Sequence, residues 1–123
     1  MARVVVVAQP APGAYPVVTA GSLDVTMQAA DVALGNYIPI VANKTLILVQ
    51  NTHATDAKTF TITSVVDAYN RTGDITAYSL AAGDIALLGP FKTEGWSHGS
   101  GADGGVWING ESADVKIANI TQG

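Results

Sequence analysis

The sequence contains no cysteine, so neither a disulfide nor a thiolate metal site can hold the fold together. Stability must come from an apolar core or from contacts with partner chains. The 123 residues are enough for one domain that buries about two-thirds of its unfolded surface. The lack of cysteine leaves the redox compartment open.

Charge is also scarce. Charged residues make up 13% of the chain, against about 25% in an average soluble domain. The six basic residues are scattered and the net charge is −4, whereas nucleic-acid binding requires clustered Lys and Arg. We therefore expect no nucleic-acid partner. The low charge favours a surface that neighbouring molecules cover, and the alternative is the Thr-rich exposed surface of a secreted or viral β protein.

Long hydrophobic runs are absent as well. No window approaches the roughly 20 apolar residues of a membrane span, so we expect no membrane partner. Arg3 and the run Val4 to Ala8 imitate a signal peptide, but the run is shorter than the usual apolar region of about 7–15 residues. These features predict a soluble, unprocessed chain.

Residues able to carry out nucleophilic catalysis are few. The two histidines are His53 and His98, and a triad could combine His98 with Ser97 or Ser100 and with Asp103. A triad requires a nucleophile on a rigid turn, a separate oxyanion hole and an orienting acid. Residues crowded into one Gly-rich stretch supply none of these. We predict that the chain has no catalytic residues and is not an enzyme.

Carboxylates and amides give equally weak signals. Asp67, Asn70 and Asp74 lie in one predicted turn and resemble a calcium loop faintly, but the dense acidic spacing of such a loop is missing. Turn-forming side chains explain them more simply. The two glutamates, Glu94 and Glu111, show no pairing typical of a sugar-cleaving site. We expect neither a metal nor a cofactor.

Residues 1–22 differ from the rest of the chain. The valine run Val4–Val7 is typical of a strand, whereas Pro10, Pro12 and Pro16 exclude a helix and the interior of a sheet. We predict an extended N-terminal arm over residues 1–22 and a β-sandwich domain over residues 23–123.

Short apolar segments separated by turn residues recur throughout that domain, which is typical of a β-sandwich or barrel. Residues 45–51 form a continuous apolar run and should be a central strand covered on both faces, whereas Pro39 should confine its strand to an edge or a bulge. One helical turn could lie within residues 27–34, and Phe91 and Trp107 should belong to the core. The strands are expected within 22–28, 36–41, 45–51, 58–66, 74–80, 85–91, 106–110 and 113–121.

Four segments between residues 65 and 109 carry a family resemblance: "DAYNRTGDIT", "LAAGDIALLGPF", "GW" and "GGVWIN". Together they resemble the capsid decoration (cement) proteins of tailed bacteriophages, with Asn70 where a glycine is expected. The resemblance implies an antiparallel, jelly-roll-like sandwich and a non-enzymatic homotrimer. It also implies a protein made in the host cytoplasm that binds the major capsid protein on the exterior of the virion. Phage tail or neck proteins are the competing class.

Partner-binding residues are predicted on the arm and in one loop. The segment Val4–Val7 should add a strand to a neighbouring subunit, and Tyr15 should anchor in a neighbour's groove. Trp96 lies in a Gly-rich loop, where it either meets a partner or packs on its own chain. The runner-up function is a carbohydrate-binding module with Trp96, Tyr69 and Tyr78 as stacking platforms.

Overall fold

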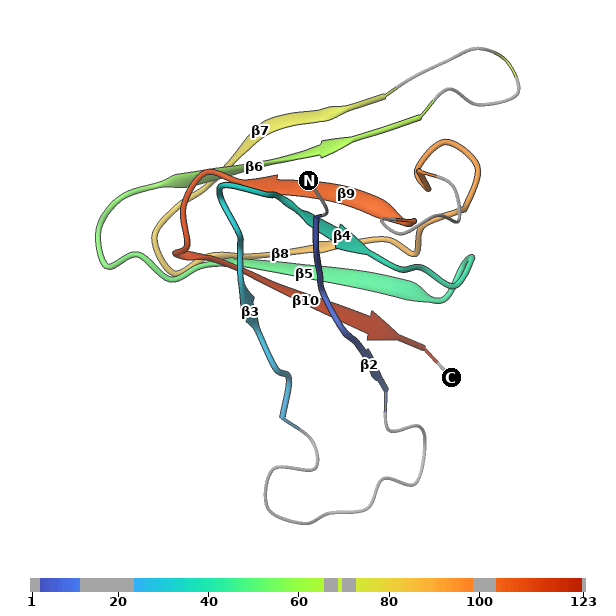
Figure 1. Cartoon of the computed structure of the whole chain (residues 1–123). Helices are drawn as coiled ribbons and strands as arrows, with labels where there is room; N and C mark the ends of the chain where they lie inside the picture. The colour runs from blue at the N-terminus through green and yellow to red at the C-terminus, as the bar shows by residue number, and fades with distance from the viewer. Residues whose placement is uncertain (1–2, 12–23, 66–68, 70–72, 99–103, 123) are drawn as a thin grey trace.

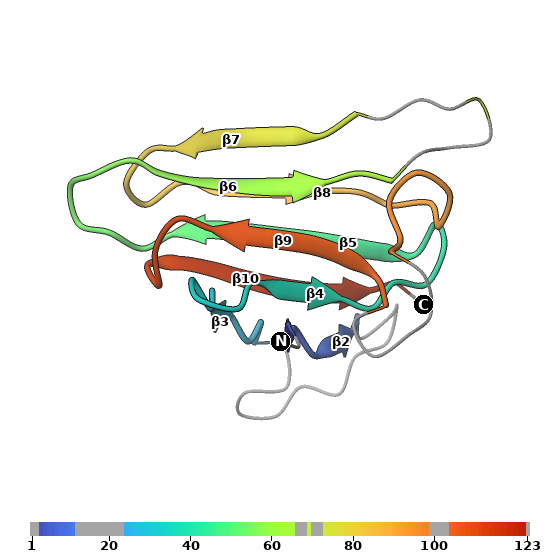
Figure 2. The same cartoon turned by 45° about the horizontal axis from the view of Figure 1, so that its top comes forward.

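The computed structural model is all-β over the residues that it describes, which are 3–11, 24–65, 69, 73–98 and 104–122. The strands form two mixed sheets of five, seen one behind the other in Figures 1 and 2. Their bounds are β1 Val4–Val5, β2 Ala8–Pro10, β3 Gln28–Ala29, β4 Asn36–Ile38, β5 Thr45–Asn51, β6 Lys58–Thr63, β7 Ile75–Leu80, β8 Ile85–Leu88, β9 Val106–Gly110 and β10 Val115–Thr121.

The first sheet has the strand order β1-β4-β9-β6-β7, and the second has β2-β10-β5-β8 with β3 also paired to β10. All pairs are antiparallel except β1 with β4 and β2 with β10, which are parallel. The prediction of a purely antiparallel fold is therefore wrong at the N-terminus. The two parallel pairs arise because one short segment supplies an edge strand to each sheet in turn.

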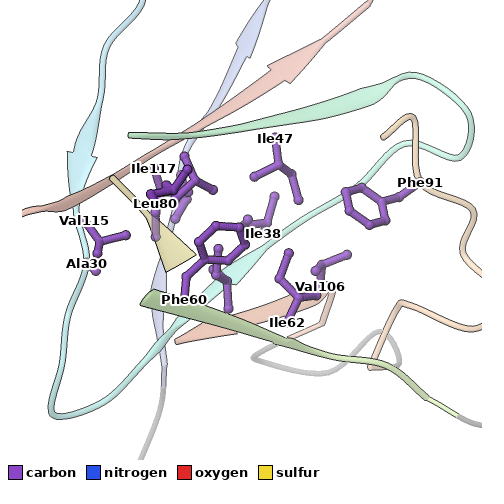
Figure 3. Close-up of a cluster of buried hydrophobic side chains, with 13 residues drawn as sticks. Ala30, Ile38, Ile47, Phe60, Ile62, Leu80, Phe91, Val106, Val115 and Ile117 are labelled. Carbon is purple, nitrogen blue, oxygen red and sulfur yellow. The ribbon is translucent and has the colours of Figure 1, made fainter. Parts of the chain in front are cut away.

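One apolar core lies between the sheets (Figure 3). Alternate residues of each strand point inward, so β5 buries Ile47 and Val49 while β6 buries Phe60 and Ile62. Phe91, which follows β8, is 5% exposed and joins the same cluster, as the sequence predicted. The core thus takes side chains from both sheets and from the segment after β8.

Residues 3–11 pack against the body of their own chain, in contrast to the predicted arm that leaves it. Val6 N–H donates to Tyr37 O at 2.9 Å in the first sheet, and Ala11 N–H donates to Thr121 O at 2.8 Å in the second. Between these two bonds the Val6 side chain enters the core and is 2% exposed. The physical reason is that β4 and β10 each offer an edge: Val4 and Val5 pair with β4, and Ala8–Pro10 pair with β10.

Two local predictions are wrong between residues 24 and 39: residues 24–27 form no strand, and the strand at Pro39 is not at an edge. The expected single turn is present at residues 32–34, where the Gly35 N–H donates to Asp31 O at 2.8 Å and the Asp31 carboxylate accepts the Leu34 N–H at 2.9 Å. Gly35, with φ +74°, then leads into β4. Pro39 lies just after β4, so β4 can pair on both sides, with β1 and with β9.

Replacing Val6 tests whether the N-terminal segment belongs to the core. Val6→Ala should lower the free energy of unfolding by about 2 kcal/mol, because it removes two buried methyl groups and leaves a cavity. Val7→Ala is the matched control, since Val7 is 70% exposed, and it should change stability by less than about 0.5 kcal/mol. Urea unfolding of both variants measures this. Equal effects would show that the segment is not packed as described.

Candidate functional site

Trp107 lies on the outer face of the first sheet, although the sequence predicted it in the core. Its neighbours on β9, Val106 and Ile108, are fully buried, so the alternation of the strand turns Trp107 outward. The His98 ring stacks on the indole with centroids 3.9 Å apart and an interplanar angle of 5°. The Arg3 guanidinium carbon lies 4.4 Å from the indole centroid. Trp107 is therefore half-covered by these two side chains.

The same two side chains are fixed by hydrogen bonds on either side of β9. Arg3 Nη1 donates to Asn109 Oδ1 at 2.9 Å and to Asn36 O at 3.2 Å. His98 Nε2 lies 2.9 Å from Thr63 O on β6. The cluster of Arg3, Trp107 and His98 thus joins the N-terminal segment to the segment before β9 across the outer surface of the first sheet.

Only two residues of the triad that was considered and rejected from the sequence, His98 and Ser97, are among the described residues. The imidazole of His98 is engaged with Trp107 and with a main-chain carbonyl, and the Ser97 N–H donates to Thr93 O at 3.0 Å. Ser100 and Asp103 lie outside the described residues. His98 is accordingly held as a packing residue on the sheet surface.

The candidate calcium residues are described only at Asp74. Its carboxylate Oδ1 accepts hydrogen bonds from Ser64 Oγ at 2.7 Å and from the Ser64 N–H at 2.8 Å, and these bonds lower the pKa of Asp74. Asp67 and Asn70 lie outside the described residues. Glu111 Oε1 accepts the Thr59 N–H at 3.0 Å. Within the described part of the chain, no three His, Cys, Asp or Glu side chains gather as a metal site would require.

The residues predicted to bind partners are placed differently from expectation. Val4 and Val5 pair with β4 of the same chain, Val6 is in its core, and Tyr15 lies outside the described residues. Trp96 packs edge-on against Phe91, with centroids 5.2 Å apart, and lies partly buried against the core of its own chain.

The other two aromatic platforms of the carbohydrate-binding hypothesis are more exposed. Tyr78 packs on Phe60 with centroids 5.4 Å apart and is 51% exposed, and Tyr69 is 76% exposed.

The second sheet exposes an apolar surface that sequence reasoning missed. Because Ile47 and Val49 point into the core, the intervening residues of β5 point to the other side of the sheet. Register places Leu48 between Leu87 of β8 and Ala118 of β10. We define the outer apolar face as Leu46, Leu48, Ile85, Leu87 and Ile120, which surround the buried Ala118.

The outer apolar face has no described strand packed over it, because the first sheet lies on the opposite side of the second (Figure 2). Ile85 is 59% exposed and Leu87 is 64% exposed. The nearest ionic side chain in register is Lys116, opposite Gln50 at the border of the face, and its ammonium group donates to Ala113 O at 2.9 Å. The sequence predicted that β5 is covered on both faces, and the described chain covers only one.

Comparison of this chain with protein-family models, curated proteins and solved structures finds no match. In the described residues there is no helix with the length and apolar character needed to cross a membrane. Function must therefore be argued from the arrangement of the chain's own residues.

Proposed function

We propose that this chain is a non-enzymatic structural protein of a tailed-phage particle, a capsid decoration protein that binds the exterior of the head. The observation that carries the proposal is the outer apolar face. Five apolar side chains from three adjacent strands form one surface of the second sheet, and two of them, Ile85 and Leu87, are more than half exposed. Contiguous apolar surface of this kind is typical of protein–protein contacts.

The strand order supports the fold that the resemblance implies. From β3 to β10, one sheet has the order β3-β10-β5-β8 and the other has the order β4-β9-β6-β7. Successive strands alternate between these sheets except for β6 and β7, which form a hairpin within one sheet. Eight strands in two facing four-stranded sheets are the arrangement of a jelly roll, so we assign the body to that class. The strands β1 and β2 are additions at one side of this body.

The outer apolar face can bind the capsid shell through many copies, each of which binds weakly. Burying one exposed leucine or isoleucine contributes about 1.5–3 kcal/mol, which is modest for a single chain. Several copies that bind a repetitive lattice together gain affinity through their high effective concentration. The partner in this proposal is the major capsid protein, and the surface that meets it is the outer apolar face.

The N-terminal segment supports exchange between copies. Every copy has the same binding site for residues 3–11, formed by the edges of β4 and β10 and by the core position of Val6. The corresponding segment of a neighbour can occupy that site with the same hydrogen bonds. We include in the proposal a homotrimer in which each copy donates this segment to the next.

Binding to phage heads tests the proposed function. Leu48→Glu should weaken binding at least tenfold, because it places a carboxylate in the centre of the outer apolar face. Thr76→Glu, at an exposed position of β7 in the first sheet, is the matched control and should bind as the unaltered chain does. Cosedimentation with purified heads of the encoding virus measures both. Binding to isolated tails in place of heads, or equal loss in both variants, would contradict the proposal.

A cysteine pair tests exchange of the segment. Gln9 of β2 lies directly opposite Ile120 of β10, so Gln9→Cys with Ile120→Cys should form a disulfide in a chain that has no other cysteine. If copies exchange their segments, oxidised protein runs as covalent multimers on a denaturing, non-reducing gel. The single variants control for random oxidation. A monomer band alone would show that each chain keeps its own segment.

A further inference from the structure

Strand β8 is the one described sheet edge that has no obvious protection against pairing. Its residues Ile85–Leu88 include no charge, no proline and no bulge, and Ile85 and Leu87 are exposed. The other edge strands are short or distorted, and these features prevent edge-to-edge pairing between molecules. The strand β1 has two residues, β2 ends on Pro10, and β7 has Ala77 at φ +47° beside a register shift.

The hydrogen bonds at the start of β8 show which main-chain groups face outward. Asn51 N–H donates to Asp84 O at 3.0 Å, so the carbonyl of Asp84 points toward β5. Antiparallel pairing alternates, and Ala86 and Leu88 therefore also direct their main-chain groups to β5. The N–H and C=O groups of Ile85 and Leu87 point away from the sheet. No described residue forms a main-chain hydrogen bond with them.

We propose that β8 pairs antiparallel with β8 of a second copy of this chain, about a two-fold axis at Ala86. This register sets Ile85 opposite Leu87 of the second copy and Leu87 opposite Ile85 of the second copy. Both are hydrogen-bonded pairs, so the outward groups of each chain are satisfied by the same groups of the other. Because the outward groups of β8 are self-complementary in this register, the strand that pairs with β8 is β8 of a second copy and not an unrelated strand.

The side chains agree with this register. The paired Ile85 and Leu87 side chains lie on the outward side of the second sheet, so the two outer apolar faces become one continuous surface across the axis. Asp84 lies opposite Leu88 of the second copy, so no like charges directly face each other. The contact is independent of capsid binding and of exchange of the N-terminal segment, and it adds a two-fold link to any threefold association.

A single cysteine tests the register. Ala86 would lie opposite Ala86 of the second copy in a non-hydrogen-bonded pair, where Cα atoms are about 4.5 Å apart and a disulfide can form. In the full-length, otherwise cysteine-free chain, Ala86→Cys should oxidise to a covalent dimer at least tenfold faster than Ser79→Cys. Ser79 is an exposed residue of the distorted edge β7 and provides the matched control. Equal rates for the two variants would overturn the proposal.

A second pair of variants tests the main-chain contact without any cysteine. Leu87→Pro removes an outward N–H that β5 does not use, whereas Leu87→Ala removes similar apolar surface and keeps the N–H. Sedimentation equilibrium should show a dissociation constant at least about tenfold higher for Leu87→Pro than for Leu87→Ala, because two symmetry-related hydrogen bonds are lost. Far-UV circular dichroism checks that both fold. Equal constants, or no β8-dependent association in the unaltered chain, would contradict the proposal.

Discussion

Closure of one side of the core depends on residues 3–11. The segment places Val6 between the sheets, and two buried amides hold it there: Asn36 Nδ2 donates to Val4 O at 3.1 Å and Asn119 Nδ2 donates to Val6 O at 3.3 Å. Without the segment, each amide would lose one acceptor inside the core, and Asn119 Nδ2 would keep only Pro39 O at 3.0 Å. An unsatisfied buried N–H costs about 1–3 kcal/mol, which favours a structure in which this site is filled by the chain's own segment or by that of a neighbour.

The opposite side of the molecule shows a contrasting arrangement. There the second sheet ends at β8, whose exposed Ile85 and Leu87 continue onto the outer apolar face. A chain with 13% charged residues has few Lys or Glu side chains with which to protect such an edge. The apolar sheet face and the unprotected strand edge both gain free energy when another molecule covers them. The low charge leaves few side chains that would oppose such a contact. These features together support a role in assembly.

The sequence predicted the all-β class and most strand positions, because period-two alternation in segments such as 58–63 has no competing interpretation. It did not predict where residues 3–11 pack, because the edges of β4 and β10 are brought together only by the fold. Trp107 was misassigned because an aromatic residue between two apolar neighbours gives no sign of which face it occupies. The outer apolar face was missed for a related reason: β5 and β8 are apolar on both faces, and composition cannot show that only one is covered.

We propose that the outer apolar face is covered in the working assembly. Hydroxyl-radical footprinting of Leu48 and Leu87, first in the isolated chain and then in native particles, measures this coverage directly, with the exposed Tyr69 as an internal reference. Oxidation of both leucines should fall severalfold in the particle, while that of Tyr69 should fall less. Unchanged oxidation of Leu48 and Leu87 would show that the face remains in solvent and that no partner covers it.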